Sequence, residues 1–191
     1  MNTTTIIRAD KAAFFKFIAS EPEGRFEYVR GRIMQQQGGT LRHARIAQRF
    51  ASVIERQLDP TIWFVSANSH GIETPQTVRY PDAIVEPVDQ PPDTLATSCP
   101  AIVVEVLSPD SDDRDLDVKP GEYLALASLQ AYVVAGQDEA VCYVWVRDSQ
   151  GAFPHEPVTV IGYEKIIEVP ALSVSIPLAE IYRDIVPDKR S

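Results

Sequence analysis

The feature that most constrains this chain is a nearly continuous apolar run, AIVVEVL, at residues 101–107. Runs of β-branched residues without polar alternation are typical of strands that are covered on both faces. The run therefore predicts the central strand of a mixed or parallel sheet with helices packed on it. It also contains Glu105, and burying an ionised carboxylate is costly unless a partner compensates its charge.

A second acid stands at the start of another short apolar run. In VRYPDAIVEP, residues 78–87, Asp82 follows a proline and precedes AIV. If this strand pairs with the one that carries Glu105, both carboxylates can reach one face of the sheet. Mg²⁺ prefers hard oxygen ligands, usually one or two carboxylates together with waters and substrate phosphates. The two acids therefore predict a metal site, although Asp82 could instead cap a turn and Glu105 could belong to a structural ion pair.

Hydrophobic periodicity predicts helices in four places. Asp10 is expected to cap a helix that runs to about Ser20, and the clearest helix covers 41–58, before Asp59-Pro60. A third helix should begin at Ser108 or Asp110 and be kinked or broken at Pro120-Gly121. A short helix is expected near the C-terminal end, after a last strand.

Strand patterns fill the segments between these helices. We expect a strand pair around the RGR turn, or one bent strand, within 25–36 and a strand at 61–67. Two short strands around a proline-containing turn are expected within 71–87, then a loop at 87–100. Residues 131–137 and 140–148 are expected to form an antiparallel pair. Together with the central strand, these segments predict an α/β fold.

Composition favours a single globular domain over residues 1–191, with 45% apolar and 24% charged residues. No apolar run approaches twenty residues, and the first twenty residues lack the pattern of a signal peptide, so we expect a cytoplasmic protein without a membrane segment. Cys99 and Cys142 are isolated, which excludes a zinc cluster built on thiolates, and both are expected in the core. No glycine-rich phosphate loop or Gly-x-Ser-x-Gly motif is present.

The net charge of −9 argues against a uniformly basic nucleic-acid binder, but the charge is segregated along the chain. Six arginines stand between residues 25 and 49 against the single acid Glu27. Arg42, Arg45 and Arg49 lie on the predicted helix at 41–58. They are candidates for contacts to nucleic-acid phosphates, and the alternative is an ordinary solvated helix face.

Six segments of the chain resemble the Uma-two family of endonucleases, members of the PD-(D/E)xK nuclease superfamily. In order they are RFEYVRGRI, RHARIAQRF, VRYPDAIV, AIVVEVLSPDSDDRDLDVKPGEY, SLQAYVV and VPALSVSIPLAEIY, and they cover nearly the whole chain. The most specific part is PD before an apolar strand combined with VVEVLSP and a downstream lysine and tyrosine. The resemblance implies a restriction-endonuclease-like core with a central mixed sheet flanked by helices. It also implies a metal-dependent endonuclease that acts on DNA.

The resemblance further implies the metal ligands. Asp82 would be the first, Glu105 the second, and the main-chain carbonyl of Val106 would complete the protein's share. The expected ion is Mg²⁺, and Mn²⁺ should substitute for it. Leu107 stands where the superfamily has its lysine, and the family places that lysine on the following helix, here Lys119.

Three more residues are implied with roles near this site, and Glu27 and His43, like Lys119, each have a simpler alternative. Tyr123 lies one turn beyond Lys119, which could merely pair with Asp115 at helical spacing. Glu27 matches an upstream glutamate near the family's site but could face solvent. His43, at the start of the arginine-bearing helix, could contact a phosphate, or it could cap or pack.

The competing interpretation is a nuclease-fold module that binds nucleic acid or a protein partner with weak or no catalysis. The acidic balance and Pro120 favour this interpretation, whereas the pair Asp82 and Glu105 favours catalysis. A homodimer is expected if the protein cuts both DNA strands, since two sites are the simplest way to do so. His70 and His155 have no companion acids at metal-like spacing, so no role is predicted for them.

Overall fold

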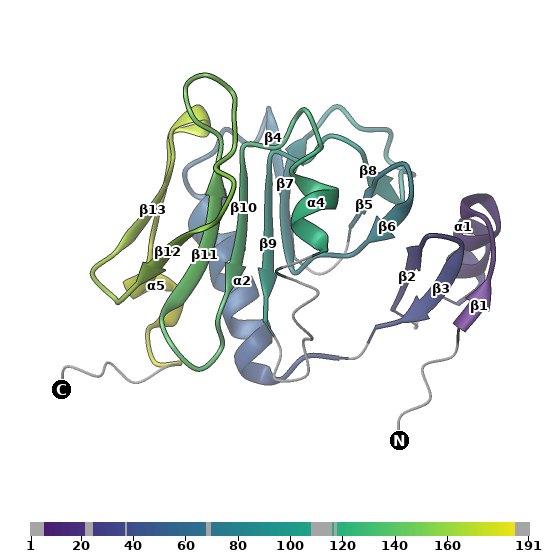
Figure 1. The fold of residues 1–191 in the computed structure, drawn as a ribbon, viewed down its shortest axis with the longest axis horizontal. Coiled ribbons are helices and arrows are strands. Elements are labelled where there is room, and N and C mark those ends of the chain that lie inside the picture. Colours follow the sequence, from purple (N-terminus) through teal and green to yellow (C-terminus); the bar gives the residue numbers. More distant parts are fainter. Residues whose placement is uncertain are drawn as a thin grey trace.

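A six-stranded mixed sheet lies at the centre of the computed structural model, which describes residues 6–21, 25–36, 38–67, 70–107, 116 and 118–185 (Figure 1). Its strand order is β12-β11-β10-β9-β7-β4. Only β9 and β10 are parallel neighbours in this sheet; the other neighbouring strands are antiparallel. The bounds are β4 Trp63–Ala67, β7 Ala83–Pro87, β9 Ile102–Val106, β10 Ala131–Ala135, β11 Val141–Val146 and β12 Val158–Ile161.

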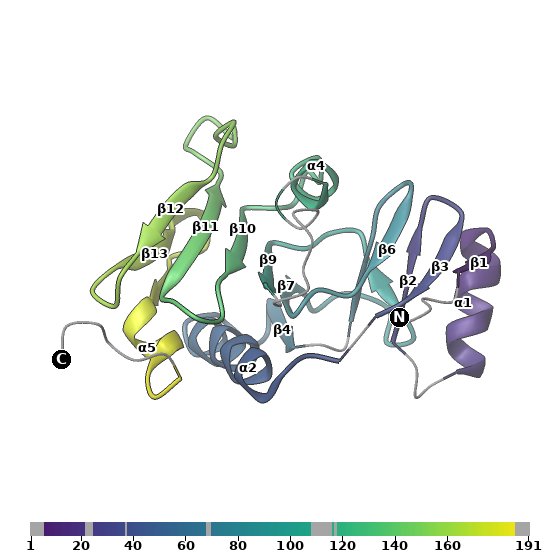
Figure 2. The same ribbon diagram turned by 60° about the horizontal axis from the view of Figure 1, so that its bottom comes forward.

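Helices cover both faces of this sheet, which explains the continuous apolar sequence of β9. All five residues of β9 are buried. Figure 2 shows α2 (Leu41–Glu55) and α5 (Leu178–Tyr182) on one face and α4 (Lys119–Tyr123) on the other. Alternate residues of β9 point to the two sides, so Val104 packs in the cluster with α2 while Val103 packs in the cluster with Tyr123.

A second six-stranded sheet, in the order β1-β3-β2-β6-β5-β8, is formed mainly by the N-terminal part of the chain. Its strands are β1 Ile6–Arg8, β2 Phe26–Val29, β3 Arg32–Gln35, β5 Gly71–Glu73, β6 Thr77–Arg79 and β8 Ala96–Thr97. Helix α1 (Lys11–Ser20) packs Phe14 against Tyr28 of β2. The chain passes from this sheet to the central one between Arg79, which ends β6, and Ala83, which begins β7.

The C-terminal part adds a hairpin to the side of the core that α2 covers. Strands β13 (Ile166–Val169) and β14 (Val174–Pro177) pair antiparallel, and the short 3-10 helix Pro170–Leu172 joins them. Val169 and Ile176 are fully buried in the same cluster as α2. This hairpin closes the α2 side of the central sheet, so the α4 side remains for the candidate site.

The predicted α/β fold with a central mixed sheet and flanking helices is confirmed, as are most of its elements. Helix α1 begins after Asp10, whose Oδ1 accepts from the N–H of Ala13 at 2.8 Å. The RGR segment forms the β2–β3 turn with Arg30 and Gly31 at positive φ, as tight hairpins require. The antiparallel pair β10–β11 and the closing strand and helix, β14 and α5, are also present.

Several predicted elements differ from the structure. Residues 71–87 hold three strands rather than two. Strands β5 and β6 belong to the second sheet, and the chain then enters the central sheet as a separate strand, β7. The expected loop at 87–100 contains β8, and two strands, β12 and β13, precede the one expected in the tail. Cys142 is buried as expected, but Cys99 is exposed, so that prediction was wrong.

The helix expected from Ser108 or Asp110 cannot be compared over its first half, because these two residues lie outside the described ones. Its described second half is α4, which begins at Lys119 and has Pro120 in its first turn. A proline is tolerated there because the N–H that it lacks would have no partner within the helix. The proline thus marks the start of α4 rather than a kink. No helix among the described residues is both long enough and apolar enough to span a membrane.

Candidate active site

Asp82 and Glu105 lie side by side at the ends of two neighbouring strands. Ala83 of β7 pairs with Val104 of β9, so the next residues along, Asp82 and Glu105, face each other. The main chain of Asp82 continues this pairing, since its N–H donates to the carbonyl of Val104 at 3.1 Å. Both acids are buried, with exposed fractions of 9% and 6%. The structure thus brings together the two carboxylates that the sequence singled out.

The Asp82 carboxylate is held from two directions. Its Oδ2 accepts the N–H of Val106 at 2.7 Å, and its Oδ1 lies 2.6 Å from Nε2 of His43. His43 belongs to the first turn of α2, where its N–H donates to the capping side chain of Thr40 at 3.1 Å. The predicted phosphate-contacting histidine therefore contacts the first predicted metal ligand. Because each carboxylate oxygen can accept more than one bond, both oxygens of Asp82 keep acceptor capacity.

His43 lies in a confined position. A Cβ on Gly39 would come within 2.7 Å of the His43 ring, so a glycine is needed for the close approach of the preceding loop. Nδ1 of His43 is buried and has no hydrogen-bonding partner among the described residues. The ring is thus fixed by packing on one side and by Asp82 on the other.

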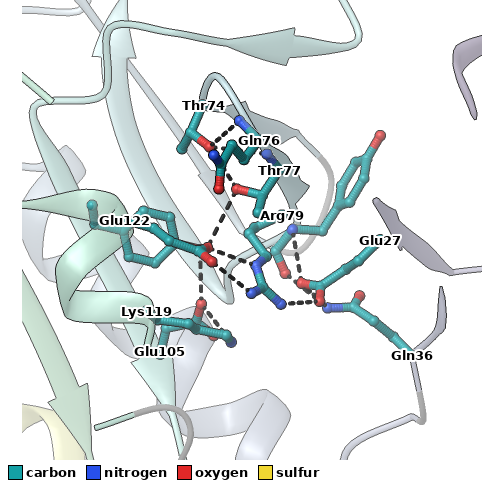
Figure 3. A network of polar contacts seen from close by, with 11 residues as sticks. Glu27, Gln36, Thr74, Gln76, Thr77, Arg79, Glu105, Lys119 and Glu122 are labelled. Carbon is teal, nitrogen blue, oxygen red and sulfur yellow. Dashed lines mark hydrogen bonds and ion pairs between the residues drawn. The ribbon is translucent and has the colours of Figure 1, made fainter. Parts of the chain in front are cut away.

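Glu105 is held by two side chains from α4. The ammonium of Lys119 lies 2.9 Å from Oε1 of Glu105 (Figure 3). The hydroxyl of Tyr123 donates to the same oxygen at 3.1 Å. Lys119 and Tyr123 are four residues apart in a helix and therefore share one face. Burial, together with the charge of Glu105, raises the pKa of Tyr123 well above its usual value, so its hydroxyl remains a donor. Asp115, the alternative partner of Lys119, lies outside the described residues.

Glu27 belongs to a second group of charges next to this one. Nη1 of Arg79 donates to Oε2 of Glu27 at 3.0 Å, and Nε2 of Gln36 donates to Oε1 at 2.8 Å (Figure 3). Arg79 also binds Glu122 of α4 through two nitrogens. Burial alone would disfavour the Arg79 cation, but hydrogen bonds to Glu122 and the charge of Glu27 outweigh it and raise the pKa. Glu27 does not face solvent, which was its simpler alternative.

The three arginines predicted to contact nucleic acid have different surroundings. Arg42 forms an ion pair with Asp138, and Arg49 donates to the carbonyls of Ile181 and Arg183 at the end of α5. Arg45 is exposed on the surface of α2. Arg45 is therefore the best placed of the three for a phosphate, while Arg49 also holds α5 against α2.

The sequence did not indicate Arg79 and Glu122 as residues of this region, and it did not indicate the partner of His70. Arg79 and Glu122 are buried or nearly so, yet neither was singled out. The signal for Arg79 was a charged residue at the end of the buried strand TVR. His70 was left without a role, but its Nδ1 lies 2.5 Å from Oε1 of Glu86, while Nε2 lies 2.9 Å from the carbonyl of Thr94. These contacts join segments that are distant in sequence, so spacing gave no indication of them.

The described residues contain no cluster of three or more His, Cys, Asp or Glu side chains that could hold a metal ion. The expected site does not depend on such a cluster, because it has only two carboxylates and the carbonyl of Val106. These are hard oxygen donors of the kind that Mg²⁺ prefers. Chemically, the site combines a pair of carboxylates with an adjacent ammonium, an arrangement suited to metal-assisted hydrolysis of a phosphate ester.

Comparisons with known proteins identify a family and a similar fold. The model of the family Uma2, described as "Putative restriction endonuclease", matches residues 12–179. Among solved structures, the chain is similar to "a putative nuclease belonging to DUF820 from Anabaena variabilis ATCC 29413". The TM-score is 0.68 at 17% identity, over 82% of this chain and 89% of that one. At this identity the likeness shows the fold. A search of curated proteins found no match.

Proposed function

Because the chain belongs to the Uma2 family, we propose that it is a metal-dependent nuclease that hydrolyses phosphodiester bonds in DNA. The observation that carries this proposal is the pair of buried carboxylates, Asp82 and Glu105, at adjacent strand positions with the ammonium of Lys119 on Glu105. Buried acids at such positions are expensive for the fold unless they serve a function or are fully paired.

The donor set fits Mg²⁺, with Mn²⁺ as a substitute. Asp82, Glu105 and the carbonyl of Val106 would supply the protein ligands. Bound there, the ion would lower the pKa of a water molecule and neutralise charge that develops on the phosphate.

The surrounding residues have supporting roles in this proposal. His43 and the N–H of Val106 hold the Asp82 carboxylate in one orientation, while Tyr123 does the same for Glu105. Lys119 is the positive group next to the reacting phosphate, where a positioned charge stabilises the transition state. Arg45 would contact the DNA backbone from the exposed side of α2.

A cleavage assay on plasmid and single-stranded DNA tests the proposal. The native chain, Asp82→Asn and Glu105→Gln are compared with Mg²⁺, with Mn²⁺ and with a chelator. The control is Glu180→Gln, which removes an acid from an exposed ion pair with Arg56 on the α2–α5 side. Circular dichroism verifies that each variant is folded.

We expect cleavage only with metal, and a loss of about a hundredfold or more in both site variants, the scale of losing a positioned electrostatic group. Glu180→Gln should cut at the native rate. Cleavage that survives in both site variants would come from another site or a contaminant. A native chain that binds DNA but cuts it with neither metal would be a binding module with a nuclease fold.

A further inference from the structure

We propose that Arg79 is a positioning residue that clamps α4 in place, so that Lys119 and Tyr123 stay on Glu105. This inference rests on the proposed nuclease function and adds to it a pair of acids, Glu27 and Glu122, that act through Arg79.

The clamp uses the whole guanidinium group. Nη1 of Arg79 donates to Oε2 of Glu27 at 3.0 Å, while Nε and Nη2 donate to the two oxygens of Glu122 at 3.0 and 3.1 Å. The side chains of all three residues are about nine-tenths buried. A bidentate guanidinium–carboxylate contact fixes the orientation of the two side chains as well as their distance, whereas a lysine at the same place would fix only the distance.

The clamp connects parts of the fold that are separate in sequence. Glu27 and Arg79 belong to strands β2 and β6 of the second sheet, whereas Glu122 belongs to α4 on the central sheet. Figure 3 shows Arg79 between the two acids, with Lys119 and Glu105 below Glu122 in this view. The hydroxyl of Thr77 on β6 also donates to Glu122 at 3.3 Å. The second sheet therefore contacts α4 on the residue that directly precedes Tyr123.

Helix α4 depends on such side-chain contacts for its position. It has five residues, contains Pro120 and Gly121, and begins without a hydrogen bond from a capping side chain. A single helical turn is not stable alone, because the first turn fixes several residues for one hydrogen bond. Lys119 and Tyr123 also hold α4 through their contacts with Glu105. These are the contacts that must keep a constant geometry, so a separate contact is needed to hold the helix.

This assignment changes the expected role of Glu27. The family resemblance implied a site residue with a catalytic role, whereas the structure surrounds the Glu27 carboxylate with donors from Arg79, Gln36 and the N–H of Tyr80. Glu27 acts here as the fixed anchor of the clamp at the second sheet. Glu122 is the end of the clamp on α4.

Four proteins separate positioning from a general structural role: the native chain, Arg79→Lys, Lys119→Ala and the double variant. Arg79→Lys keeps the positive charge but loses the bidentate contact with Glu122. We expect it to slow single-turnover cleavage by about tenfold, since small misplacements of catalytic groups have large effects on rate. DNA affinity should stay within about twofold of native. In the Lys119→Ala background the same substitution should slow cleavage clearly less than in the native chain, because one of the two groups that Arg79 positions is gone and only Tyr123 remains on Glu105. Equal slowing in both backgrounds would overturn the proposal.

Hydrogen exchange tests the clamp without any need for activity. The N–H of Leu124 donates to the carbonyl of Pro120 at 2.8 Å, so its exchange reports on α4. We expect Arg79→Lys and Glu122→Gln to accelerate exchange in 119–124 and leave β9 unchanged. Arg56→Lys, which alters an exposed arginine–acid pair, is the matched control.

The two experiments distinguish failure of the clamp from failure of the proposed function. Unchanged exchange in 119–124 for both Arg79→Lys and Glu122→Gln overturns the positioning role, whatever the native chain does to DNA. Faster exchange in these two variants, together with a native chain that never cuts DNA, supports the clamp and contradicts the proposed nuclease function. If Arg79→Lys does not fold, Glu122→Gln provides the same reading, since it weakens the clamp from the α4 side.

Discussion

The ammonium of Lys119 lies 2.9 Å from Oε1 of Glu105, and the two side chains are 11% and 7% exposed. Their charges compensate each other in a place that water hardly reaches. Glu105 therefore has two roles. It is a candidate metal ligand, and without metal it is one half of a buried ion pair. Removing either partner leaves the other charge buried.

Glu105→Gln is therefore expected to destabilise the metal-free protein. Breaking a buried pair from one side costs ~3–5 kcal/mol, and the glutamine retains an acceptor for Tyr123, so we expect about 3 kcal/mol. Urea unfolding in the presence of a chelator measures it. Glu105→Gln combined with Lys119→Met should recover part of the loss, because no charge is then left without a partner. A Glu105→Gln variant as stable as the native chain would mean that the pair contributes nothing to folding.

Metal binding should depend on Asp82 and not on Glu27. Asp82→Asn removes a ligand charge at almost constant shape, so calorimetric titration should show Mn²⁺ affinity reduced by more than about tenfold. Glu27→Gln is the matched control, because it neutralises an equally buried acid whose contacts are with Arg79 and Gln36. Equal losses in the two variants would place the metal elsewhere.

The salt dependence of DNA binding should distinguish Arg45 from Arg49. Each lost phosphate contact lowers the log–log slope by about one, and we expect this for Arg45→Ala. Arg49→Ala should change the slope less and instead lower the melting temperature, because Arg49 donates to carbonyls at the end of α5. Binding is measured with Ca²⁺ in place of Mg²⁺ to prevent cleavage. If the slope is the same for native and Arg45→Ala, the DNA does not lie on this face of α2.

His70 should make folding stability depend on pH. Both its ring nitrogens face acceptors, Glu86 and the Thr94 carbonyl, so only the protonated ring can donate to both. The hydrogen bond to Glu86 raises the pKa of His70 above its usual 6.5. A raised pKa contributes stability that is complete below pH 6.5 and disappears as the pH rises through the folded-state pKa.

The stability difference between native and His70→Asn should therefore shrink from pH 6 towards pH 9, as measured by urea unfolding at each pH. His155→Asn is the control, because His155 is 96% exposed and pairs only with its neighbour Glu156. A difference between native and His70→Asn that stays constant with pH would show that folding does not shift the pKa of His70.

The fold was predictable from sequence wherever periodicity and burial coincide. The unbroken apolar run of β9 and the apolar stripe of α2 each indicated a single structure, and both are present. The strands that were missed are short or exposed: β8 has two residues, and most of β12 faces solvent. Such segments are determined by their pairing partners, and a local pattern does not contain that information.

The residues of the candidate site were also predictable only in part. Glu105 was identifiable because a carboxylate within a buried strand needs a partner, and Asp82 because it begins the next apolar run. Their proximity to Lys119 came from the family resemblance, since no local pattern links a strand to the helix that follows it. The contact of His43 with Asp82 depends on how α2 packs on the central sheet, and the clamp around Arg79 depends on how the second sheet meets α4. Sequence spacing encodes neither arrangement.

The parallel pairing of β9 and β10 has a consequence for how the site responds to heat. Parallel neighbours require a crossover between them, and α4, with its lysine and tyrosine, belongs to that crossover rather than to the sheet. The carboxylates are thus held by the hydrogen-bonded central sheet, while the ammonium is supplied by a connection outside it, and we expect that connection to open locally while the sheet stays paired. Warming should inactivate the protein below its main melting transition and reversibly, because the crossover can return to a sheet that has kept its shape.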